Sequence, residues 1–366
     1  MTAPGTLARE AVRTLPLYAP GQADCAIDLS DNVNLWGAAP AALRALRDAE
    51  PPAISRYPSL YAGPLREASL GYLGLAGHAD TLGVVTGCGS DDVLDSAMRA
   101  FGGDGARIAF SAPTFSMIPT FARLNGIAPV AVPFTAHYDI DAERLVACDA
   151  AITYLCTPNN PTATPASRAA VEHVVAHARG IVLIDEAYAE FSPDTYADLA
   201  RASERVLIVR TFSKAFGLAG LRVGYGVGAR ALTELVERAR GPYKVNVLAE
   251  RAALASLVHD DDGAGWVRRH AALAVEVRER LAAGLRALGL VPLPSAANFL
   301  FVPTADARAI AAALRERGVL LRALSGLPRD LAALDAAEGC ALRIGVGPWE
   351  AMQTVLDLLR EVTPCA

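Results

Sequence analysis

The chain has 366 residues, enough for about two domains and a large hydrophobic core. Hydrophobic residues make up 52 % of it and charged residues 20 %, which favours a well-buried, oligomeric globular protein. The net charge is -5 and the sequence contains no long basic run, so nucleic acid is not expected as a partner. No apolar run approaches the roughly 20 residues of a membrane span, and charged residues interrupt the N-terminus where a signal peptide needs an apolar stretch. We therefore predict a cytoplasmic protein that does not contact a membrane.

The cysteines and histidines do not form a metal-binding pattern. His173 and His177 stand four residues apart on a predicted helix, a spacing that could hold a metal. The sequence offers no His-Glu-x-x-His motif and no obvious third ligand, so we interpret this face as solvated and predict no metal. The cysteines lack Cys-x-x-Cys spacing and are interpreted as reduced thiols, mostly in the core. They are Cys25, Cys88, Cys148, Cys156, Cys340 and Cys365.

The order of predicted elements indicates two domains. Residues 1–30 are predicted to be an N-terminal arm with helical character, broken by Pro16, Pro20 and Gly21. Strand and helix patterns then alternate to about residue 250, which predicts an α/β domain with a mostly parallel sheet and helices on both faces. From Gly263 the pattern changes to one long helix over 266–288, followed by short strands and helices. We predict an arm (1–30) that packs with the small domain, a large cofactor-binding domain (31–255) and a small α+β domain (256–366).

The first glycine-rich turn predicts an anion site. A strand over 81–86 runs into Gly87-Cys88-Gly89-Ser90-Asp91-Asp92 and then into a helix over 93–101. Free backbone N–H groups and the positive end of a helix both favour an anion at such a turn. Position 92 is not glycine and no Gly-Lys pair follows, so the dinucleotide and P-loop motifs do not match. An ordinary helix with Ser90 as its N-cap is the alternative.

Three further strands end at polar residues. The strand 107–110 leads to Pro113-Thr114-Phe115, and the strand 151–156 leads to Thr157-Pro158-Asn159-Asn160-Pro161-Thr162. The apolar strand 181–184 ends at Asp185, and a buried carboxylate there would need a cationic partner. Asp185 as a structural turn residue is the alternative.

Lysine is almost absent from the sequence. Of the 34 basic residues only Lys214 and Lys244 are lysines. An arginine cannot lose its proton in a protein, whereas a lysine amine can react with a carbonyl. Lys214 follows the predicted strand 206–209, in the loop where open α/β sheets bind ligands. Arg222 is a candidate anion ligand, with Gly220 and Gly224 expected to permit close backbone approach. Lys214 as an ordinary surface residue remains the alternative.

The segment Ser213-Lys-Ala-Phe-Gly-Leu-Ala-Gly-Leu-Arg-Val-Gly-Tyr225 resembles the cofactor-lysine segment of fold-type I pyridoxal-phosphate enzymes, most closely that of histidinol-phosphate aminotransferases. The resemblance implies that family's fold, with a seven-stranded sheet in the large domain. It also implies that Lys214 binds the aldehyde of pyridoxal 5'-phosphate and that Ser213 and Arg222 bind its phosphate. In this context Gly89, Ser90 and Asp91 are expected to contact the same phosphate. Lys214 is preferred over Lys244, which lacks the glycine and arginine neighbours.

Other segments resemble the same family in the same order. Phe115 matches the aromatic residue that stacks on the cofactor ring, although it could be a simple core residue. Asn160 and Tyr188 match the residues at the phenolic oxygen, and Asp185 matches the partner of the ring nitrogen. Ala163 stands where the family has glycine, a change that affects loop geometry. Lys214, Asp185 and Tyr188 are the predicted catalytic residues.

The resemblance also suggests residues at the substrate entrance. The segment 27–37 is similar to the family's Asn-Glu-Asn-Pro-Tyr-Gly segment and implies substrate contacts from Asn32 and Trp36. Val33 and Leu35 depart from it, at the positions of the family's glutamate and proline. Arg343 matches the arginine that takes the substrate's anionic group, although a lone arginine in a strand is usually a partnered structural cation.

Arg56-Tyr57-Pro58 resembles the segment whose tyrosine reaches the cofactor phosphate of the partner subunit. This implies a homodimer with shared active sites. A tyrosine in a turn packed on the surface is the alternative for Tyr57.

Together these residues predict an aminotransferase that takes a small amine donor and a 2-oxo acid acceptor. The first candidate reaction is L-histidinol phosphate with 2-oxoglutarate, giving imidazole acetol phosphate and L-glutamate. An aromatic or other amino-acid aminotransferase is the alternative, because the guanidinium of Arg343 would pair with a phosphate or a carboxylate. A decarboxylase of the threonine-phosphate type fits the 216–220 segment less well. A pyridoxal-dependent regulator would need a DNA-binding domain before residue 40, and a silent binding protein is the remaining class.

Overall fold

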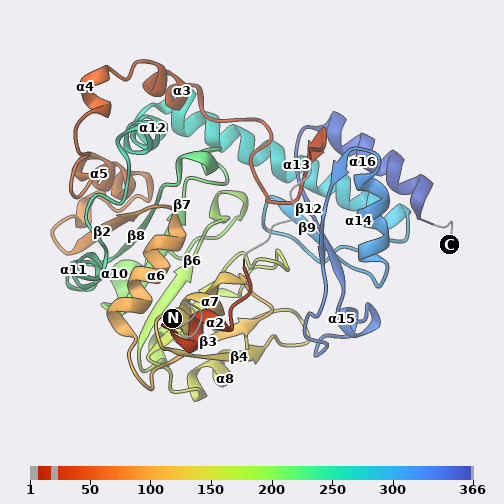
Figure 1. Ribbon diagram of the computed structural model, residues 1–366, viewed down its shortest axis with the longest axis horizontal. Coiled ribbons are helices and arrows are strands. Elements are labelled where there is room, and N and C mark those ends of the chain that lie inside the picture. Colours follow the sequence, from red (N-terminus) through yellow and green to blue (C-terminus); the bar gives the residue numbers. More distant parts are fainter. Residues whose placement is uncertain (1–6, 18–23, 364–366) are drawn as a thin grey trace.

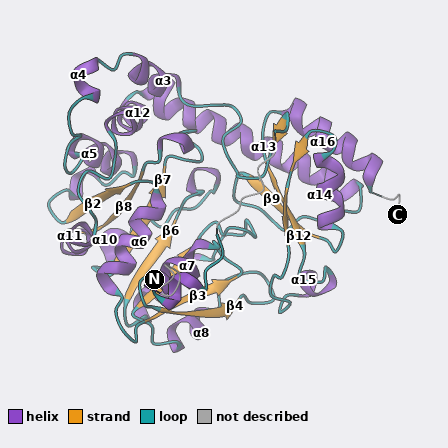
Figure 2. Ribbon diagram, in the orientation of Figure 1, coloured by secondary structure: helices purple, strands orange, loops and turns teal. Residues whose placement is uncertain are grey.

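A computed structural model describes residues 7–17 and 24–363 of the chain. Pro20, Gly21 and Cys365 lie outside the described residues, as do parts of the predicted arm. Figures 1 and 2 show two groups of strands, each with its own helices, and a long helix, α13 (Gly265–Ala287), that extends from one group to the other. The helix predicted over 266–288 is confirmed. The boundaries 1–30, 31–255 and 256–366 stay a prediction.

The larger group is a seven-stranded sheet of order β2-β8-β7-β6-β5-β3-β4. The strand β8 is antiparallel to both of its neighbours, and the remaining pairs are parallel. This architecture confirms the predicted α/β fold with a mostly parallel sheet. The strands are β2 (Leu82–Gly87), β3 (Arg107–Ala112), β4 (Ala128–Pro133), β5 (Ile152–Cys156), β6 (Ile181–Asp185), β7 (Val206–Thr211) and β8 (Gly224–Ala229).

Both faces of this sheet are buried, which explains the nearly continuous apolar strands. Successive side chains of a strand point to opposite faces. In β6 the residues Ile181 and Leu183 join one hydrophobic cluster, and Val182 and Ile184 join the other. Helices cover the two faces. They are α3 (Pro40–Arg47), α4 (Pro51–Ile54), α5 (Gly63–Tyr72), α6 (Ser90–Phe101), α7 (Met117–Leu124), α8 (Ala142–Ala147), α9 (Arg168–His177), α10 (Leu199–Ala202), α11 (Arg230–Ala239) and α12 (Val247–Val258), with the single turns η1 (Ala76–His78), η2 (Ala189–Phe191), η3 (Ala219–Leu221) and η4 (Asp260–Ala264).

The strand directions bring distant parts of the sequence to one edge of the sheet. The strands β2, β3, β5, β6 and β7 run the same way, so their carboxyl ends meet at this edge. The antiparallel β8 begins there. The predicted site residues follow these strand ends or precede β8, which places most of them at the edge where open α/β sheets bind ligands.

The smaller group is a three-stranded antiparallel sheet of order β11-β12-β9. Its core contains Leu281 and Leu285 of α13 and Leu356 and Leu359 from the last helix. The elements are β9 (Phe299–Pro303), α14 (Ala307–Arg315), β10 (Val319–Leu320), β11 (Arg322–Leu324), α15 (Ala332–Ala336), β12 (Ala341–Gly345) and α16 (Trp349–Val362). Among the described helices, none combines the length and the apolar character needed to cross a membrane.

The described N-terminal residues contact both groups. The short strand β1 (Ile27–Asp28) pairs in parallel with β10 of the small domain. Near α2 (Glu10–Arg13), the guanidinium of Arg9 donates to the carbonyl of Leu124 at the end of α7, at 2.9 Å. Beyond β1 the chain turns toward the edge of the large sheet, which brings residues 31–33 to the site.

Candidate active site

A cavity of about 300 Å³ lies at the edge where the parallel strands end. The N-terminal segment, the large sheet and the small sheet all contribute to its lining. Most of the residues that the sequence predicts for the site line this cavity. They are Asn32, Ser90, Asp91, Phe115, Asn160, Asp185, Tyr188, Ser213, Lys214, Arg222 and Arg343.

Lys214 lies in the loop after β7 and faces this cavity rather than the outer surface. Its Nζ donates a hydrogen bond to the backbone carbonyl of Asp31 at 2.8 Å. Burial and the nearby guanidinium of Arg343 lower the pKa of the amine to about 8, against the opposite effect of Asp31 and Asp91. A substantial fraction of the amine is therefore neutral near pH 8. A neutral amine is the form that attacks a carbonyl carbon.

One end of the cavity is built to take an anion. The guanidinium of Arg222 lies 3.4 Å from the hydroxyl of Ser213 and 3.1 Å from the carboxylate of Asp91. Ser90 is the first residue of α6, so the positive end of this helix points at the same place. Burial raises the pKa of Asp91, although Arg222 and Lys214 act in the other direction.

Two glycines permit this close packing. Gly89 has a φ of +79°, and a Cβ there would lie 2.6 Å from the Arg222 guanidinium. A Cβ at Gly224 would lie 2.4 Å from the backbone nitrogen of Ser90, so that prediction is confirmed. A Cβ at Gly220 would meet no protein atom within 4 Å, so the close approach of an anion there stays a prediction. The N-cap of α6 is Gly89, so the alternative of Ser90 as N-cap was wrong.

Asp185, the last residue of β6, is only 4 % exposed. One carboxylate oxygen accepts the hydroxyl of Tyr154 at 2.7 Å, and the other accepts the backbone N–H of Ala187 at 3.1 Å. Burial raises the pKa of Asp185 to about 6, partly offset by these two hydrogen bonds. Within residues 7–17 and 24–363, no lysine or arginine forms an ion pair with it. A cationic group in the cavity would supply the partner that this carboxylate needs.

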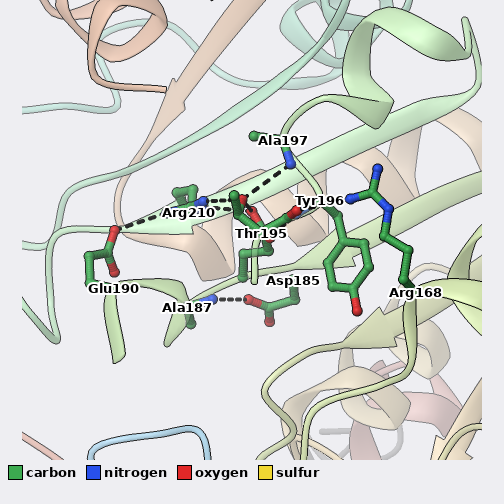
Figure 3. Close-up of polar contacts among 9 residues, drawn as sticks. Arg168, Asp185, Ala187, Glu190, Thr195, Tyr196, Ala197 and Arg210 are labelled. Carbon is green, nitrogen blue, oxygen red and sulfur yellow. Dashed lines mark hydrogen bonds and ion pairs between the residues drawn. The ribbon is translucent and has the colours of Figure 1, made fainter. Parts of the chain in front are cut away.

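The adjacent Glu186 points to the opposite face of the sheet and is fully paired. It accepts from Arg210 Nε at 2.8 Å and from the backbone N–H of Tyr196 at 2.6 Å. Arg210 also pairs with Glu190 at 3.0 Å and donates to the hydroxyl of Thr195 at 2.8 Å. Figure 3 shows these bonds of Arg210, with Asp185 held separately by Ala187. This network ties β7 to the segment after β6.

Asn32 and Tyr188 form a second polar group in the cavity. The amide of Asn32 donates to the Tyr188 hydroxyl at 3.2 Å, and burial raises the pKa of Tyr188 above its usual range. Asn32 is 2 % exposed, and its side-chain oxygen has no hydrogen-bond partner among the described residues. This buried acceptor fits a ligand that brings a donor.

Arg343 reaches the cavity from β12 of the small domain. Its guanidinium donates to the side-chain oxygen of Asn160 at 2.8 Å and to the carbonyl of Ser30. Arg322 of β11 lies directly opposite Arg343 in the sheet and pairs with Asp31. The cavity therefore has positive charge on the side of the small domain as well as at Arg222.

Two predicted site residues, Tyr57 and Trp36, and Lys244, the alternative to Lys214, lie outside the cavity. Tyr57 is 82 % exposed and stacks on Tyr243, with ring centroids 4.7 Å apart. Trp36 packs against one hydrophobic cluster of the large sheet and against the core of the small domain, and it does not line the cavity. Lys244 donates to Asp92 at 2.9 Å, so this second lysine is held in an ion pair outside the cavity.

Sequence reasoning did not single out Tyr154, Cys156 or Asp31, although all three bear on the site. Cys156 and Asp31 line the cavity, and Tyr154 bonds Asp185. The two-residue alternation of β5 was the available signal, because Tyr154 and Cys156 share the face on which Asp185 lies.

The cavity has the parts that pyridoxal phosphate requires. It holds an amine with a lowered pKa, an anion pocket, a buried carboxylate and the aromatic ring of Phe115. In the described part of the chain, no group of three or more His, Cys, Asp or Glu residues could hold a metal ion. His173 and His177 stack on each other, and His173 also lies 3.3 Å from Glu143.

Comparisons with known proteins agree with this geometry. A family model described as aminotransferase class I and II matches residues 25–357. The chain is 39 % identical over 350 residues to a histidinol-phosphate aminotransferase of Roseiflexus castenholzii, which covers 92 % of this chain and 89 % of the relative. It is 34 % identical over 309 residues to an aromatic amino acid aminotransferase of Cutibacterium acnes, with 81 % and 85 % covered. A crystal structure of histidinol-phosphate aminotransferase from Sinorhizobium meliloti, in complex with pyridoxal-5'-phosphate, superposes with a TM-score of 0.82 at 26 % identity, covering 97 % and 96 % of the chains.

The chain therefore belongs to the class I and II aminotransferases. It is an enzyme of the fold-type I class, and its cofactor is pyridoxal 5'-phosphate. These findings confirm the predicted family, enzyme class and cofactor.

Proposed function

We propose that the enzyme transfers the amino group of L-histidinol phosphate to 2-oxoglutarate, yielding imidazole acetol phosphate and L-glutamate. The observation that carries this proposal is the cavity itself, where Lys214 and Asp185 lie with Arg343 in one lining. The Roseiflexus castenholzii relative, which is 39 % identical and covers 92 % of this chain, supports the choice of donor. An arginine near the reacting amine suits a donor or acceptor that carries an anionic end.

Lys214 is proposed to move the proton. The bound cofactor supplies an aldehyde carbon that accepts the amino group and a ring that spreads the negative charge left on the substrate. Lys214 Nζ would hold that aldehyde, and in its neutral form it would take the proton from the α-carbon of the donor.

The remaining residues are proposed to bind and orient. Asp185 keeps the ring nitrogen protonated, and Asn160 and Tyr188 contact the phenolic oxygen. Phe115 packs on the ring face, because a flat ring favours a flat partner. The phosphate is held by Gly89, Ser90, Asp91, Ser213 and Arg222. Arg343 and Asn32 contact the substrate.

We also propose a homodimer with shared active sites, in which Tyr57 reaches the phosphate of the partner subunit. The exposure of Tyr57 and its stacked neighbour Tyr243, together with the exposed Ile54 and Tyr61 nearby in the sequence, supports an interface there. We also propose a cytoplasmic location.

Mixing two inactive variants tests the shared site. In a hybrid dimer of Tyr57→Ala and Lys214→Ala subunits, one site has Lys214 from one chain and Tyr57 from the other. Unfolding and refolding the two variants together should restore activity, with one intact site in about half of the dimers if subunits mix randomly. Refolded mixtures that remain as inactive as the separate variants would contradict the proposal.

Substrate preference tests the proposed donor. Enzyme loaded with pyridoxal phosphate is mixed with L-histidinol phosphate or with L-phenylalanine, and glutamate formed from 2-oxoglutarate is measured. We expect kcat/KM to be roughly tenfold or more higher for L-histidinol phosphate, because its phosphate carries more negative charge than a carboxylate and pairs more strongly with the half-buried Arg343. Higher kcat/KM for L-phenylalanine would favour the aromatic aminotransferase, which the Cutibacterium acnes relative and the departures at Val33 and Leu35 support. Release of carbon dioxide in place of glutamate would favour the decarboxylase.

A further inference from the structure

A buried tyrosine lies beneath the site without lining it. Tyr154 is in β5, is 1 % exposed and donates its hydroxyl to the Asp185 carboxylate at 2.7 Å. In the pairing of β5 with β6, Cys156 stands beside Asp185, so Tyr154 is two residues earlier on the same face. Its hydroxyl therefore reaches the carboxylate from a position two residues before the one that pairs with Asp185.

The Tyr154 hydroxyl is shielded from solvent. Tyr154 lies in the hydrophobic cluster that contains residues of α6 and α7, and the side chains of Tyr154 and Asp185 are 1 % and 4 % exposed. Burial and the nearby Asp185 raise the pKa of Tyr154 well above its usual range, so the phenol keeps its proton and always donates. A hydrogen bond to an ionised acceptor is stronger than one between neutral groups.

The Tyr154 hydroxyl affects Asp185 differently from the way a cationic side chain would. An arginine at this point would neutralise the carboxylate and compete with any cationic ligand, as Arg210 does for Glu186. A neutral hydroxyl stabilises the ionised carboxylate without cancelling its charge. The charge remains available on the side of the cavity.

We propose that Tyr154 is a positioning residue for the reaction: its hydroxyl fixes the orientation of the Asp185 carboxylate and keeps it ionised toward the cavity. The proposal rests on the role proposed for Asp185 at the ring nitrogen of the cofactor. Tyr154 touches neither substrate nor cofactor and acts only through this bond.

The variant Tyr154→Phe removes the hydroxyl and little else. In the apoprotein, selective ¹³C labelling of aspartate follows the carboxyl of Asp185, whose signal is assigned by its loss in Asp185→Asn. We expect the titration midpoint of Asp185, about 6 in the wild-type protein, to rise by about one pH unit. In the loaded enzyme, kcat should fall about tenfold while KM changes less than about twofold, because the lost bond orients no substrate.

Tyr225→Phe is the matched control. Tyr225 is also 1 % exposed, and its hydroxyl has no hydrogen-bond partner among the described residues. Removing it should leave both the titration of Asp185 and kcat unchanged. If Tyr154→Phe does not fold, 3-fluorotyrosine at position 154 preserves the packing and makes a stronger donor, so the midpoint of Asp185 should then move down.

An unchanged midpoint of Asp185 in Tyr154→Phe or with 3-fluorotyrosine would overturn the proposal, and so would a shifted midpoint with unchanged kcat. The apoprotein titration needs no cofactor or substrate. If L-histidinol phosphate proved not to be the amine donor, the expected titration of Asp185 would still hold. The failure of the proposed function and the failure of the Tyr154 proposal are therefore distinguishable.

Discussion

Asp185 and Glu186 are adjacent in the sequence, and they end up in opposite situations on the two faces of one sheet. Glu186 is clamped by Arg210 within a network that includes Glu190 and Thr195. Among the residues that the structure describes, Asp185 receives only neutral donors, from Tyr154 and from the backbone of Ala187. Both carboxylates are almost fully buried. Burial alone therefore does not separate a structural charge from a functional one.

The two carboxylates differ in which group neutralises them. On the Glu186 face the protein supplies its own cation, so the ion pair stabilises the fold. On the Asp185 face the cation is left to a ligand, and the folded protein carries a carboxylate with a pKa raised to about 6. The pKa of Lys214 is also shifted in favour of the neutral form, because burial lowers the pKa of its amine to about 8. Changes on the cavity face should alter activity, and changes on the opposite face should alter stability.

The largest effect is expected for Lys214→Ala. Without the amine, turnover should fall by at least about 10⁴-fold, because proton transfer and covalent attachment of the cofactor are both lost. The stability of the apoprotein should change little. Steady-state kinetics and the visible absorbance band of the bound cofactor measure the effect.

The other lysine is the control for that variant. Lys244→Ala should keep the absorbance band and most of the activity, since Lys244 pairs with Asp92 outside the cavity. Borohydride reduction followed by mass spectrometry should place the cofactor on the peptide of Lys214. Label on Lys244 in the wild-type enzyme would refute the assignment.

On the opposite face, Arg210→Met should mainly destabilise the protein. Removing this guanidinium leaves the carboxylates of Glu186 and Glu190 buried without their cation, which costs on the order of 3–5 kcal/mol. Urea unfolding of the apoprotein measures the loss. Arg179→Met is the comparison, because its ion pair with Asp149 is exposed and should contribute less than about 1 kcal/mol. Equal losses from the two variants would remove the contrast between the faces.

Much of this site was predictable, because open α/β sheets bind ligands at the carboxyl ends of their parallel strands. Ser90, Asp185 and Lys214 each follow an apolar strand, and parallel strands bring such positions to one edge whatever their separation in sequence. The alternation of β5 places Tyr154 on one face of the sheet, but its contact with Asp185 also depends on how β5 and β6 are paired. The path of the loop likewise decides that Gly224, and not Gly220, meets the first residue of α6. Tyr57 stays a prediction, because its proposed partner belongs to a second subunit.

Asp185→Asn should lower activity and raise stability, whereas Arg210→Met should mainly lower stability. The folded protein holds the proton of Asp185 more tightly than the unfolded chain, with a pKa of about 6 against 3.8. Stability is therefore lost as pH rises from about 4 through 6 and stays lower above that range. A shift of about two units corresponds to about 3 kcal/mol, and the amide gives up one hydrogen bond worth about 1 kcal/mol.

The asparagine apoprotein should thus be more stable than wild type by about 2 kcal/mol at pH 8, while turnover falls. Urea unfolding at pH 4 and pH 8 provides the check. The gain should disappear at pH 4, where the wild-type carboxyl is protonated in the folded state. An equal gain in stability at pH 4 and pH 8 would show that the ionised Asp185 carboxylate does not destabilise the apoprotein.

The smallest effect concerns the pH at which Lys214 captures the cofactor. The rate of capture by the apoprotein should rise with pH through about 8, because only the neutral amine attacks the aldehyde. Arg343 contributes to the lowered pKa, so Arg343→Gln should move the midpoint to higher pH by a fraction of a unit to about one unit. Stopped-flow absorbance at constant ionic strength measures the rate. Arg179→Met, far from the cavity, should leave the midpoint in place, and an unmoved midpoint in Arg343→Gln would mean that burial alone sets the reactivity of Lys214.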